Sequence, residues 1–410
     1  MDRQDPLRAV RQKFRLPKNK DGKTAIYFLG NSLGAQPKTA RNYVAKEMQR
    51  WANLGVEAFF EGDEPWLDYN RRLNPLLARM VGAKTKEVVA MSSLTVNIHA
   101  ALTAFLKLTP ERNRVVVVGS PFPSDVYAVD SQIRMRGFNP TNCLRKIAPR
   151  ENEDLVRIED IQHYFQQNGR QTALALVEQP SYLTGQAHDM ELLTAFAHGE
   201  GCKIGFDLAH GFGNLNLKLH ASEADFAVWC GYKFGNDGPG GVGGLFVHEN
   251  HHKDQTLNHL AGWWGESLQR RFKMRPDFIP DSTAQGFQIS TPSPLQLACL
   301  QASLEIYDEV GMRNFVQKQR LLTGYLEFLI GDLPHSFCEI ITPASPYFRG
   351  SSLSLRVRKQ PRKLVQALRA DGIFVDFRNP NIVRAAPNPL YNRFEEVFRF
   401  SEILHAHAGR

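Results

Sequence analysis

The sequence predicts an α/β fold, with a large, mostly parallel sheet covered by helices on both faces and a smaller α+β region towards the C-terminal end. Short apolar runs, such as Arg114 to Val118 and Thr172 to Val177, are typical of buried parallel strands. Segments with apolar residues at helical spacing alternate with these runs, which indicates a layered α/β arrangement. The length of 410 residues suits a large domain with a smaller companion.

The predicted elements follow one another along the chain. Helical spacing appears at about 36–52 and 95–108, and the first two apolar runs come next. Further apolar runs end near 207 and 230. A long helical pattern covers 295–310 and continues to 330, before a strand-like stretch at 351–357 and a helix at about 361–370. We therefore expect a large α/β domain at 26–300 and a small α+β domain at 301–410.

Composition excludes several classes of protein. Hydrophobic residues make up 42% and charged residues 22%, as in ordinary globular proteins. No apolar run approaches the roughly 18 residues of a membrane span, and Met1 to Pro6 lacks the apolar core of a signal peptide, so a cytoplasmic location is expected. The net charge of +8 is dispersed, without a nucleic-acid-binding signature, and we expect no nucleic-acid partner.

Cysteines and histidines give no metal-binding pattern. The five cysteines, Cys143, Cys202, Cys230, Cys299 and Cys338, are odd in number and scattered, which favours reduced thiols over disulfides or a zinc site. His248, His251 and His252 could be taken for a metal tract. Their polar neighbours favour a solvated loop instead, and we predict no metal.

Lys233 is the strongest chemical signal. The apolar run Phe226 to Cys230 ends just before this lysine and gives way to a glycine-rich stretch. A lysine that forms a Schiff base must be held rigidly, partly desolvated, beside backbone thin enough to admit a flat cofactor. Pyridoxal 5'-phosphate (PLP) fits this description, although a surface lysine before a loop is the alternative.

Asp207 is the expected partner of that lysine. It ends the short strand that begins near Cys202, and His210 follows shortly after it. Ligands of α/β sheets bind at the carboxyl ends of the strands, and a carboxylate there can pair with the pyridine nitrogen of PLP. The two segments together predict a PLP site.

Several further segments carry motifs that occur together in one enzyme family. In chain order they are Tyr27 to Gly34, Leu94 to Asn97, Phe122 to Asp125, Asp207 to Asn214, Trp229 to Lys233, Leu260 to Gly265 and Arg378 to Asn381. Together they resemble the kynureninase family, PLP enzymes of the class V aminotransferase-like group, over nearly the whole chain. The resemblance implies PLP-dependent transferase fold type I with a seven-stranded sheet, and an N-terminal arm at 1–25 that packs with the small domain.

The resemblance also implies a reaction, the hydrolysis of L-kynurenine or 3-hydroxykynurenine to the matching anthranilate and L-alanine. Lys233 would hold PLP and act as base at Cα, Asp207 would keep the ring protonated, and Tyr232 would donate a proton in the second half. His210 would orient the ring hydroxyl or Lys233. A homodimer with sites shared across the interface and an amino-acid substrate are the implied partners.

Other cofactor contacts are implied in the same way. Phe122 would stack on the ring, with Ser124 and Asp125 beside it, although Phe122 could be core and Asp125 a helix cap. Leu94 and Thr95 would hold the phosphate at a helix N-terminus, which is compatible with an ordinary Thr N-cap. The remaining phosphate contacts implied are Tyr232, Trp263, Ser290 and Thr291.

On the substrate side, Arg384 would grip the α-carboxylate through its planar guanidinium. A structural ion pair is the alternative reading. Val56, Trp264 and Ser290 would border the substrate. Because Val56 offers no hydrogen-bond donor, unsubstituted kynurenine is expected to be the better substrate.

The chain also departs from the family pattern, with Gly235 and Asp237 after the lysine, Val56 near a position for histidine, and Glu266 after Gly265. These changes leave the PLP chemistry in place and put the ring specificity in question. Two other readings remain open. One is a class V relative such as a cysteine desulfurase or an aminotransferase, and the other is a PLP-fold binding protein without catalysis.

Overall fold

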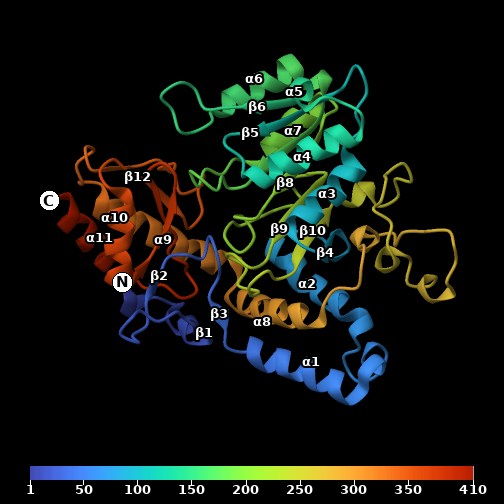
Figure 1. The fold of residues 1–410 in the computed structure, drawn as a ribbon, viewed down its shortest axis with the longest axis horizontal. Coiled ribbons are helices and arrows are strands. Elements are labelled where there is room, and N and C mark those ends of the chain that lie inside the picture. Colours follow the sequence, from blue (N-terminus) through green and yellow to red (C-terminus); the bar gives the residue numbers. More distant parts are fainter. Residues whose placement is uncertain (410) are drawn as a thin grey trace.

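The computed structural model describes residues 1–409, which form a large sheet with helices on both faces and a smaller sheet beside it (Figure 1). The large sheet has seven strands in the order β4-β10-β9-β8-β7-β5-β6. Their bounds are β4 Val88–Ala90, β5 Arg114–Val118, β6 Leu144–Ile147, β7 Thr172–Glu178, β8 Lys203–Asp207, β9 Phe226–Cys230 and β10 Gly243–Val247. The predicted α/β class is confirmed.

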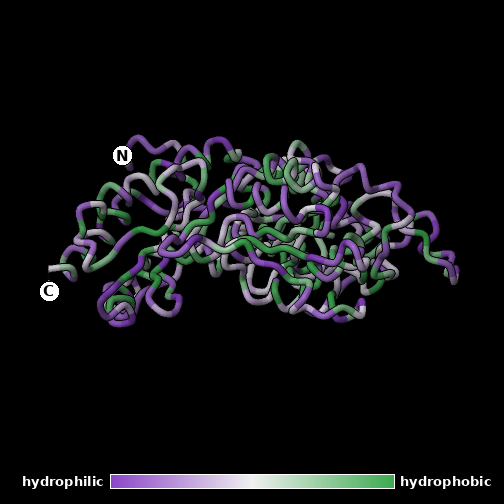
Figure 2. The backbone as a smooth tube through the Cα atoms, turned by 90° about the horizontal axis from the view of Figure 1, so that it is seen from above, coloured by the Kyte–Doolittle hydropathy of each residue, from purple (hydrophilic) through white to green (hydrophobic). Residues whose placement is uncertain are grey.

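Strand direction also agrees with the prediction of a mostly parallel sheet. The strands from β9 through β8, β7 and β5 to β6 are parallel, and β10 alone runs antiparallel to both of its neighbours. Every residue of β7, β9 and β10 is buried, as expected for strands covered on both faces. Figure 2 shows this as hydrophobic stretches through the middle of the larger part of the molecule.

Two helical layers enclose the sheet. The core on one face contains α3 and α4, and the core on the other contains α2, α6, α7 and α8. The bounds are α2 Tyr69–Val81, α3 Leu94–Phe105, α4 Pro123–Met135, α5 Pro140–Cys143, α6 Ile158–Asn168, α7 Met190–Gly199 and α8 Pro294–Val310. The helix α1, Ala40–Leu54, lies along α8, and Tyr43 donates to Glu305 at 2.6 Å.

Strand alternation decides where the polar strand ends point. In β7, Val177 packs in the core of α2, α6 and α7, and in β8 Phe206 does the same. Successive side chains of a strand point to opposite faces, so Glu178 and Asp207 both point to the α3 and α4 side. The two residues are also register partners. The fold therefore places two buried carboxyl groups side by side at the carboxyl ends of adjacent strands.

The smaller sheet is antiparallel, with the order β11-β12-β15-β14, and packs with three helices. The bounds are β11 Cys338–Ile340, β12 Leu353–Val357, β14 Asp376–Arg378, β15 Ile382–Ala385, α9 Met312–Ile330, α10 Pro361–Ala370 and α11 Phe394–Ala408. The predicted helical stretch after 294 is two helices, because Gly311 separates α8 from α9 with φ of 72°. The expected domain boundary at 300 falls within α8.

The start of the chain joins this smaller part. Strand β2 (Ile26–Tyr27) pairs in parallel with β13 (Ile373–Phe374), and β1 (Phe14–Arg15) pairs with β3 (Gln36–Pro37). Asp2 accepts hydrogen bonds from the first N–H groups of α11, and Lys318 forms a buried ion pair with Asp5 at 2.8 Å. These contacts tie the first residues to the last helix.

The polar neighbours of the histidines after β10 are exposed, as predicted, but the histidines themselves are not fully solvated. His248 is 4% exposed, its ring stacks on that of His220, and His252 contacts the carbonyl of Val247. His248 and His220 also lie with Glu87 in one cluster, where Glu87 is already paired with His220 and two backbone N–H groups. Packing with distant segments, which local composition does not show, buries His248 and partly covers His251 and His252.

Asp225 joins several elements at the start of β9. Its carboxylate is 1% exposed and contacts His198 at 2.9 Å, His251 at 2.8 Å and Lys203 at 2.9 Å, and accepts the backbone N–H of Ile204. Burial acts to raise the pKa of Asp225, but the two histidine hydrogen bonds and the charge of Lys203 outweigh it and hold that pKa below its ordinary value.

No helix among residues 1–409 is long and apolar enough to span a membrane. The five cysteines are unpaired.

We predict that Asp225→Asn lowers the free energy of unfolding at pH 7 by about 3 kcal/mol, the low end for breaking a buried ion pair, because His198 and Lys203 can still reach water. A depressed pKa stabilises the fold above the unfolded value near 4 and loses that effect as the pH falls. The difference between wild type and variant, measured by denaturant unfolding, should therefore shrink below about pH 4. A constant difference from pH 7 to pH 3 would contradict this account.

Candidate active site

Three carboxyl groups gather at the strand ends on the α3 and α4 side. Asp207 ends β8, Glu178 ends β7, and Asp125 lies in the first turn of α4. Their exposed fractions are 1%, 6% and 2%. Buried carboxyl groups are costly unless they are protonated or paired, so this cluster needs a cation or protons.

Lys233 supplies the cation. It lies three residues after the end of β9, the strand next to the one that ends at Asp207, and its Nζ lies 5.8 Å from the centroid of the Phe122 ring. Its charge lowers the pKa values of Asp125, Asp207 and Glu178. The structure thus brings Lys233, Asp207, Asp125 and Phe122 together, as the sequence predicts.

The loop that holds Lys233 is fixed from two sides. Tyr307 of α8 donates to the carbonyl of Phe234 at 2.6 Å, and the N–H of Gly34 donates to the carbonyl of Tyr232 at 2.8 Å. A Cβ on Gly34 would lie 2.4 Å from the Lys233 carbonyl oxygen, so only glycine allows this approach. The N-terminal motif therefore serves to position the lysine.

Asp125 and Asp207 differ in how strongly their pKa values are raised. Burial raises the pKa of Asp125 well above its ordinary value, and the neighbouring Asp207 and Glu178 raise it further. Burial also raises the pKa of Asp207, whereas a hydrogen bond from Asp125, the charge of Lys233 and the N–H of Ala209 at 2.7 Å lower it. The pKa of Asp125 is thus raised further than that of Asp207, and Asp125 holds its proton more tightly of the two.

His210 and Tyr232 border the cluster in their uncharged forms. Burial lowers the pKa of His210 well below its ordinary value, with the charges of Lys233 and Arg384 acting in the same direction, so the imidazole is neutral at pH 7. Burial raises the pKa of Tyr232 above its ordinary value, so the phenol keeps its proton. Tyr232 immediately precedes Lys233 in the chain, which places its backbone close to the carboxyl cluster.

The N-terminus of α3 offers free donors for an anion. Ser93 is the N-cap but does not cap the helix with its side chain, and Thr95 is exposed. The first N–H groups of a helix have no partner within it and favour negative charge. The side-chain amide of Asn97 donates hydrogen bonds to the carbonyls of Met91, just before the helix, and of Gly244 in β10, and so fixes the start of α3. Leu94 and Thr95 are therefore well placed for a phosphate.

Arg384 lies in β15 and is 1% exposed. Its guanidinium forms an ion pair with Asp376, donates to the carbonyl of Tyr182, and lies 5.9 Å from the centroid of the Tyr182 ring. Tyr182 in turn packs edge-on against Phe122, with ring centroids 5.3 Å apart. Through Tyr182 and Phe122, Arg384 is thus connected to the carboxyl cluster around Lys233. The structural ion pair that the sequence analysis gave as the alternative role of Arg384 is also present, with Asp376.

A second group of predicted residues lies apart from Lys233. Trp263 packs against Phe272 with centroids 5.7 Å apart and donates to the carbonyl of Arg271, while Trp264 is 2% exposed between Phe59 and Arg271. Val56, Ser290 and Thr291 are exposed. Among the described residues, no hydrogen bond or aromatic contact links these side chains to Lys233. Their loops lie at one edge of the molecule (Figure 1).

Four further residues of the site were missed by the sequence analysis. Glu178 ends an apolar run just as Asp207 does, which is the signal that could have found it. Asp376 and Tyr182 come from segments without motifs. Asn31 is 1% exposed, and neither of its amide atoms has a hydrogen-bond partner, which is costly unless a ligand pairs with it.

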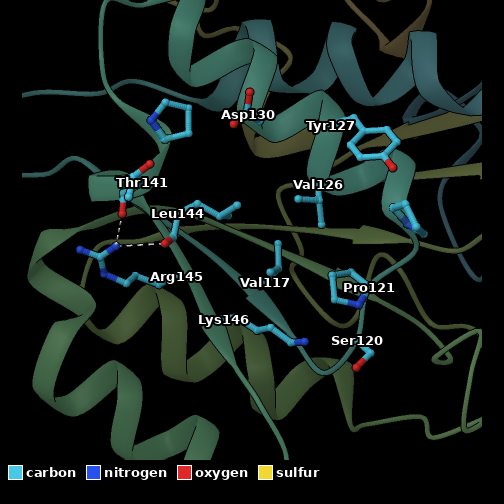
Figure 3. A pocket seen from close by; sticks show the side chains of 12 residues that line it. Val117, Ser120, Pro121, Val126, Tyr127, Asp130, Thr141, Leu144, Arg145 and Lys146 are labelled. Carbon is cyan, nitrogen blue, oxygen red and sulfur yellow. Dashed lines mark hydrogen bonds between the residues drawn. The ribbon is translucent and has the colours of Figure 1, made fainter.

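A separate cavity of about 620 Å³ lies beside α4 and β6 (Figure 3). Its wall includes Val117, Val126 and Leu144, and the guanidinium of Arg145 is turned to the backbone carbonyls of Thr141 and Leu144. The lining also includes Asp130 and Lys146, but Asp130 pairs with Arg134 of the same helix and Lys146 is exposed, so neither is a buried group like Asp207. The strand-end cluster is therefore the candidate active site.

Comparison with known proteins agrees with this geometry. The Kynureninase C-terminal domain family matches residues 316–404. A kynureninase of Myxococcus xanthus is 47% identical over 100% of this chain and 96% of its own length, and one of Koribacter versatilis is 46% identical over 98% and 94%.

Solved structures of lower identity share the fold. A C-DES mutant with glycine covalently linked to the PLP cofactor has a TM-score of 0.78 at 18% identity and covers 93% of this chain and 96% of its own. The apo cysteine desulfurase of Thermococcus onnurineus has a TM-score of 0.75 at 19% identity, with coverage of 94% and 95%. The fold is that of PLP-dependent fold type I enzymes, and with relatives at this identity over its full length the chain belongs to the kynureninase family.

Proposed function

We propose that this chain hydrolyses L-kynurenine to anthranilate and L-alanine, with PLP bound at the Lys233 site. The observation that carries the proposal is the juxtaposition of Lys233, Asp207 and Phe122 at the carboxyl ends of β8 and β9. Kynureninases similar over the full length of the chain support the same reaction.

The residues present fit PLP. The amine of Lys233 would hold its aldehyde carbon, Asp207 its ring nitrogen, Phe122 its ring face, and the N-terminus of α3 its phosphate. Asp125 is buried with one carboxyl oxygen unpaired, as expected for a site that awaits a polar ligand. When bound, PLP supplies an electron sink for charge that develops at the substrate Cα.

The chain's own residues handle protons and position. Lys233 removes the Cα proton as general base and returns it to form alanine. Asp207 holds the ring nitrogen in its protonated form, and Asp125 stabilises Asp207 as a carboxylate through its hydrogen bond. Tyr232, whose raised pKa keeps it protonated, donates the proton at Cβ after the Cβ–Cγ bond breaks. Neutral His210 orients the neighbouring groups without adding charge.

Arg384 is the proposed anchor of the substrate α-carboxylate. Asp376 fixes the guanidinium from one side, while Arg378 at 3.0 Å and Ser32 at 3.2 Å bind the same Asp376 oxygen. The Nε of Arg384 is buried without a partner. Asn31, adjacent to Ser32 in sequence and similarly unpaired, is the second candidate for the carboxylate. An arginine held in this way is preorganised to bind an anion.

We also propose a homodimer with shared sites. Trp263, Phe60 and Phe272 are 48%, 51% and 47% exposed, and the first two both pack against Phe272, which is unusual for an uncovered surface. A Cβ at Gly262 would lie 2.0 Å from the carbonyl oxygen of Ile289, so the segments of Trp263 and of Ser290 and Thr291 lie together. In a dimer they would reach the phosphate of the second subunit, and Val56 and Trp264 would border its substrate ring.

We predict that the purified protein converts L-kynurenine to anthranilate and that Lys233→Ala abolishes this turnover. Borohydride reduction of the wild type should fix PLP on the peptide containing Lys233, as mass spectrometry would show. Lys218→Ala, an exposed lysine outside the site, is the matched control and should keep full activity. Turnover of kynurenine by Lys233→Ala at the wild-type rate would refute the proposed function.

Arg384→Lys keeps the charge but loses the planar fork. We expect kcat/KM to fall by about ten- to a hundredfold, or roughly 1.4–3 kcal/mol, with PLP content unchanged. Arg378→Lys is the control, since it shares Asp376 but is 37% exposed, and should change kcat/KM less. Steady-state kinetics and PLP absorbance decide the matter. An unchanged kcat/KM in Arg384→Lys would favour a purely structural ion pair.

A further inference from the structure

We propose that Glu178 is a proton-exchange residue of this active site, which carries protons between the Lys233 side of the strand ends and a polar cavity behind it. The proposal rests on the proposed function, because hydrolysis of kynurenine produces the proton that has to leave. Glu178 takes no part in holding PLP or the substrate carboxylate in the account given above.

One side of Glu178 faces the reacting groups. It is the register partner of Asp207 and points to the same face of the sheet, where Asp125 also lies. The N–H of Tyr182 donates to its carboxylate, and the charges of Lys233 and Arg384 act on it. Glu178 is thus linked to both the proposed base and the proposed substrate anchor.

The other side faces a cavity of about 150 Å³. Polar side chains from the loops after β6 and β7 line it together with Glu178, namely Glu153, Asp154, Ser181, Thr184 and His188. A polar cavity of this size has room for several water molecules with hydrogen-bond partners. Glu153 is 29% exposed, so the cavity lies next to solvent.

The protonation of Glu178 suits exchange near neutral pH. Burial and the neighbouring Asp207 raise its pKa to about 8, although the Tyr182 N–H and the charges of Lys233 and Arg384 act in the opposite direction. On the cavity side, burial lowers the pKa of His188 to about 4, so it is neutral, and Asp154 is paired with Arg356. Proton transfer is most efficient when the pKa of the group lies near the working pH.

The proposed reaction releases a proton, which a proton-exchange residue has to accept. Water adds across the Cβ–Cγ bond, its hydroxyl to the carbonyl carbon and its hydrogen to Cβ. The products are zwitterionic alanine and anthranilic acid, which ionises at neutral pH, so a zwitterionic substrate yields a proton in each turnover. Lys233 recovers only the Cα proton. Because the pKa of Glu178 lies near the working pH, the residue exchanges between both forms, and its deprotonated form accepts the extra proton and passes it to water in the cavity.

The protonation is tested directly in the PLP-free protein. Carbon-13 NMR of glutamate-labelled protein, titrated from pH 3 to pH 10, should show a carboxyl that titrates near pH 8 and is missing in Glu178→Gln. Glutamine has the shape of the protonated acid, so the variant should fold. A Glu178 carboxyl that titrates near the ordinary value of about 4.3 would overturn the proposal.

Kinetics of the PLP-loaded enzyme give the second test. Glu178→Gln should retain PLP and still cleave kynurenine, with kcat reduced about tenfold or more, and added imidazole should restore part of the rate. Glu178→Asp should keep part of it, and Glu151→Gln, an exposed control, should match wild type. An unchanged kcat, or a loss that imidazole does not rescue, contradicts proton exchange. Failure of the wild type to cleave kynurenine would instead refute the proposed function and leave the NMR result valid.

Discussion

The structure depends on placing one lysine against three buried carboxyl groups at the carboxyl ends of β7, β8 and β9. Such a cluster is unfavourable unless charge and protons balance, and the fold provides that balance. Strand alternation and the register of Glu178 with Asp207 set the carboxyls on one face, and α4 adds Asp125. Lys233 supplies the positive charge, and the raised pKa values of Asp125 and Glu178 keep protons in the cluster.

The rest of the chain holds this arrangement in place. The N-terminal motif reaches the Lys233 loop through Gly34, and Ser32 reaches Asp376, which pairs with Arg384 of the small sheet. Strand β2 pairs with β13, so the same N-terminal segment also belongs to the C-terminal part. One segment therefore couples the proposed cofactor site to the proposed carboxylate anchor. This coupling explains why motifs so distant in sequence act together.

Much of the fold could be predicted from the sequence, because its strands are buried on both faces and read as apolar runs. The bounds of β5 and the ends of β8 and β9 agree with the sequence analysis, and so Asp207 and Lys233 were found. The reversed direction of β10 depends on tertiary packing, whereas the break at Gly311 has a local signal, a glycine with positive φ, that the sequence analysis did not use. Glu178 also ends an apolar run, but the sequence analysis missed it, because only its pairing with Asp207 in the sheet shows that it lies beside the Lys233 site. The histidines after β10 were read as solvated, because local polarity does not reveal the segments that cover them. The roles of Trp263, Thr291 and Val56 stay predictions, since they concern a second subunit.

The most direct test of this account is Asp207→Asn, which keeps the shape of the residue and removes the carboxylate opposite Lys233. PLP absorbance and single-turnover kinetics with kynurenine would be measured on the same preparation. The account predicts that PLP is retained and that kcat falls by at least about a hundredfold, or roughly 2.7 kcal/mol, because an unprotonated ring is a poor electron sink. Normal turnover by Asp207→Asn would contradict it and would require a different partner for the ring nitrogen.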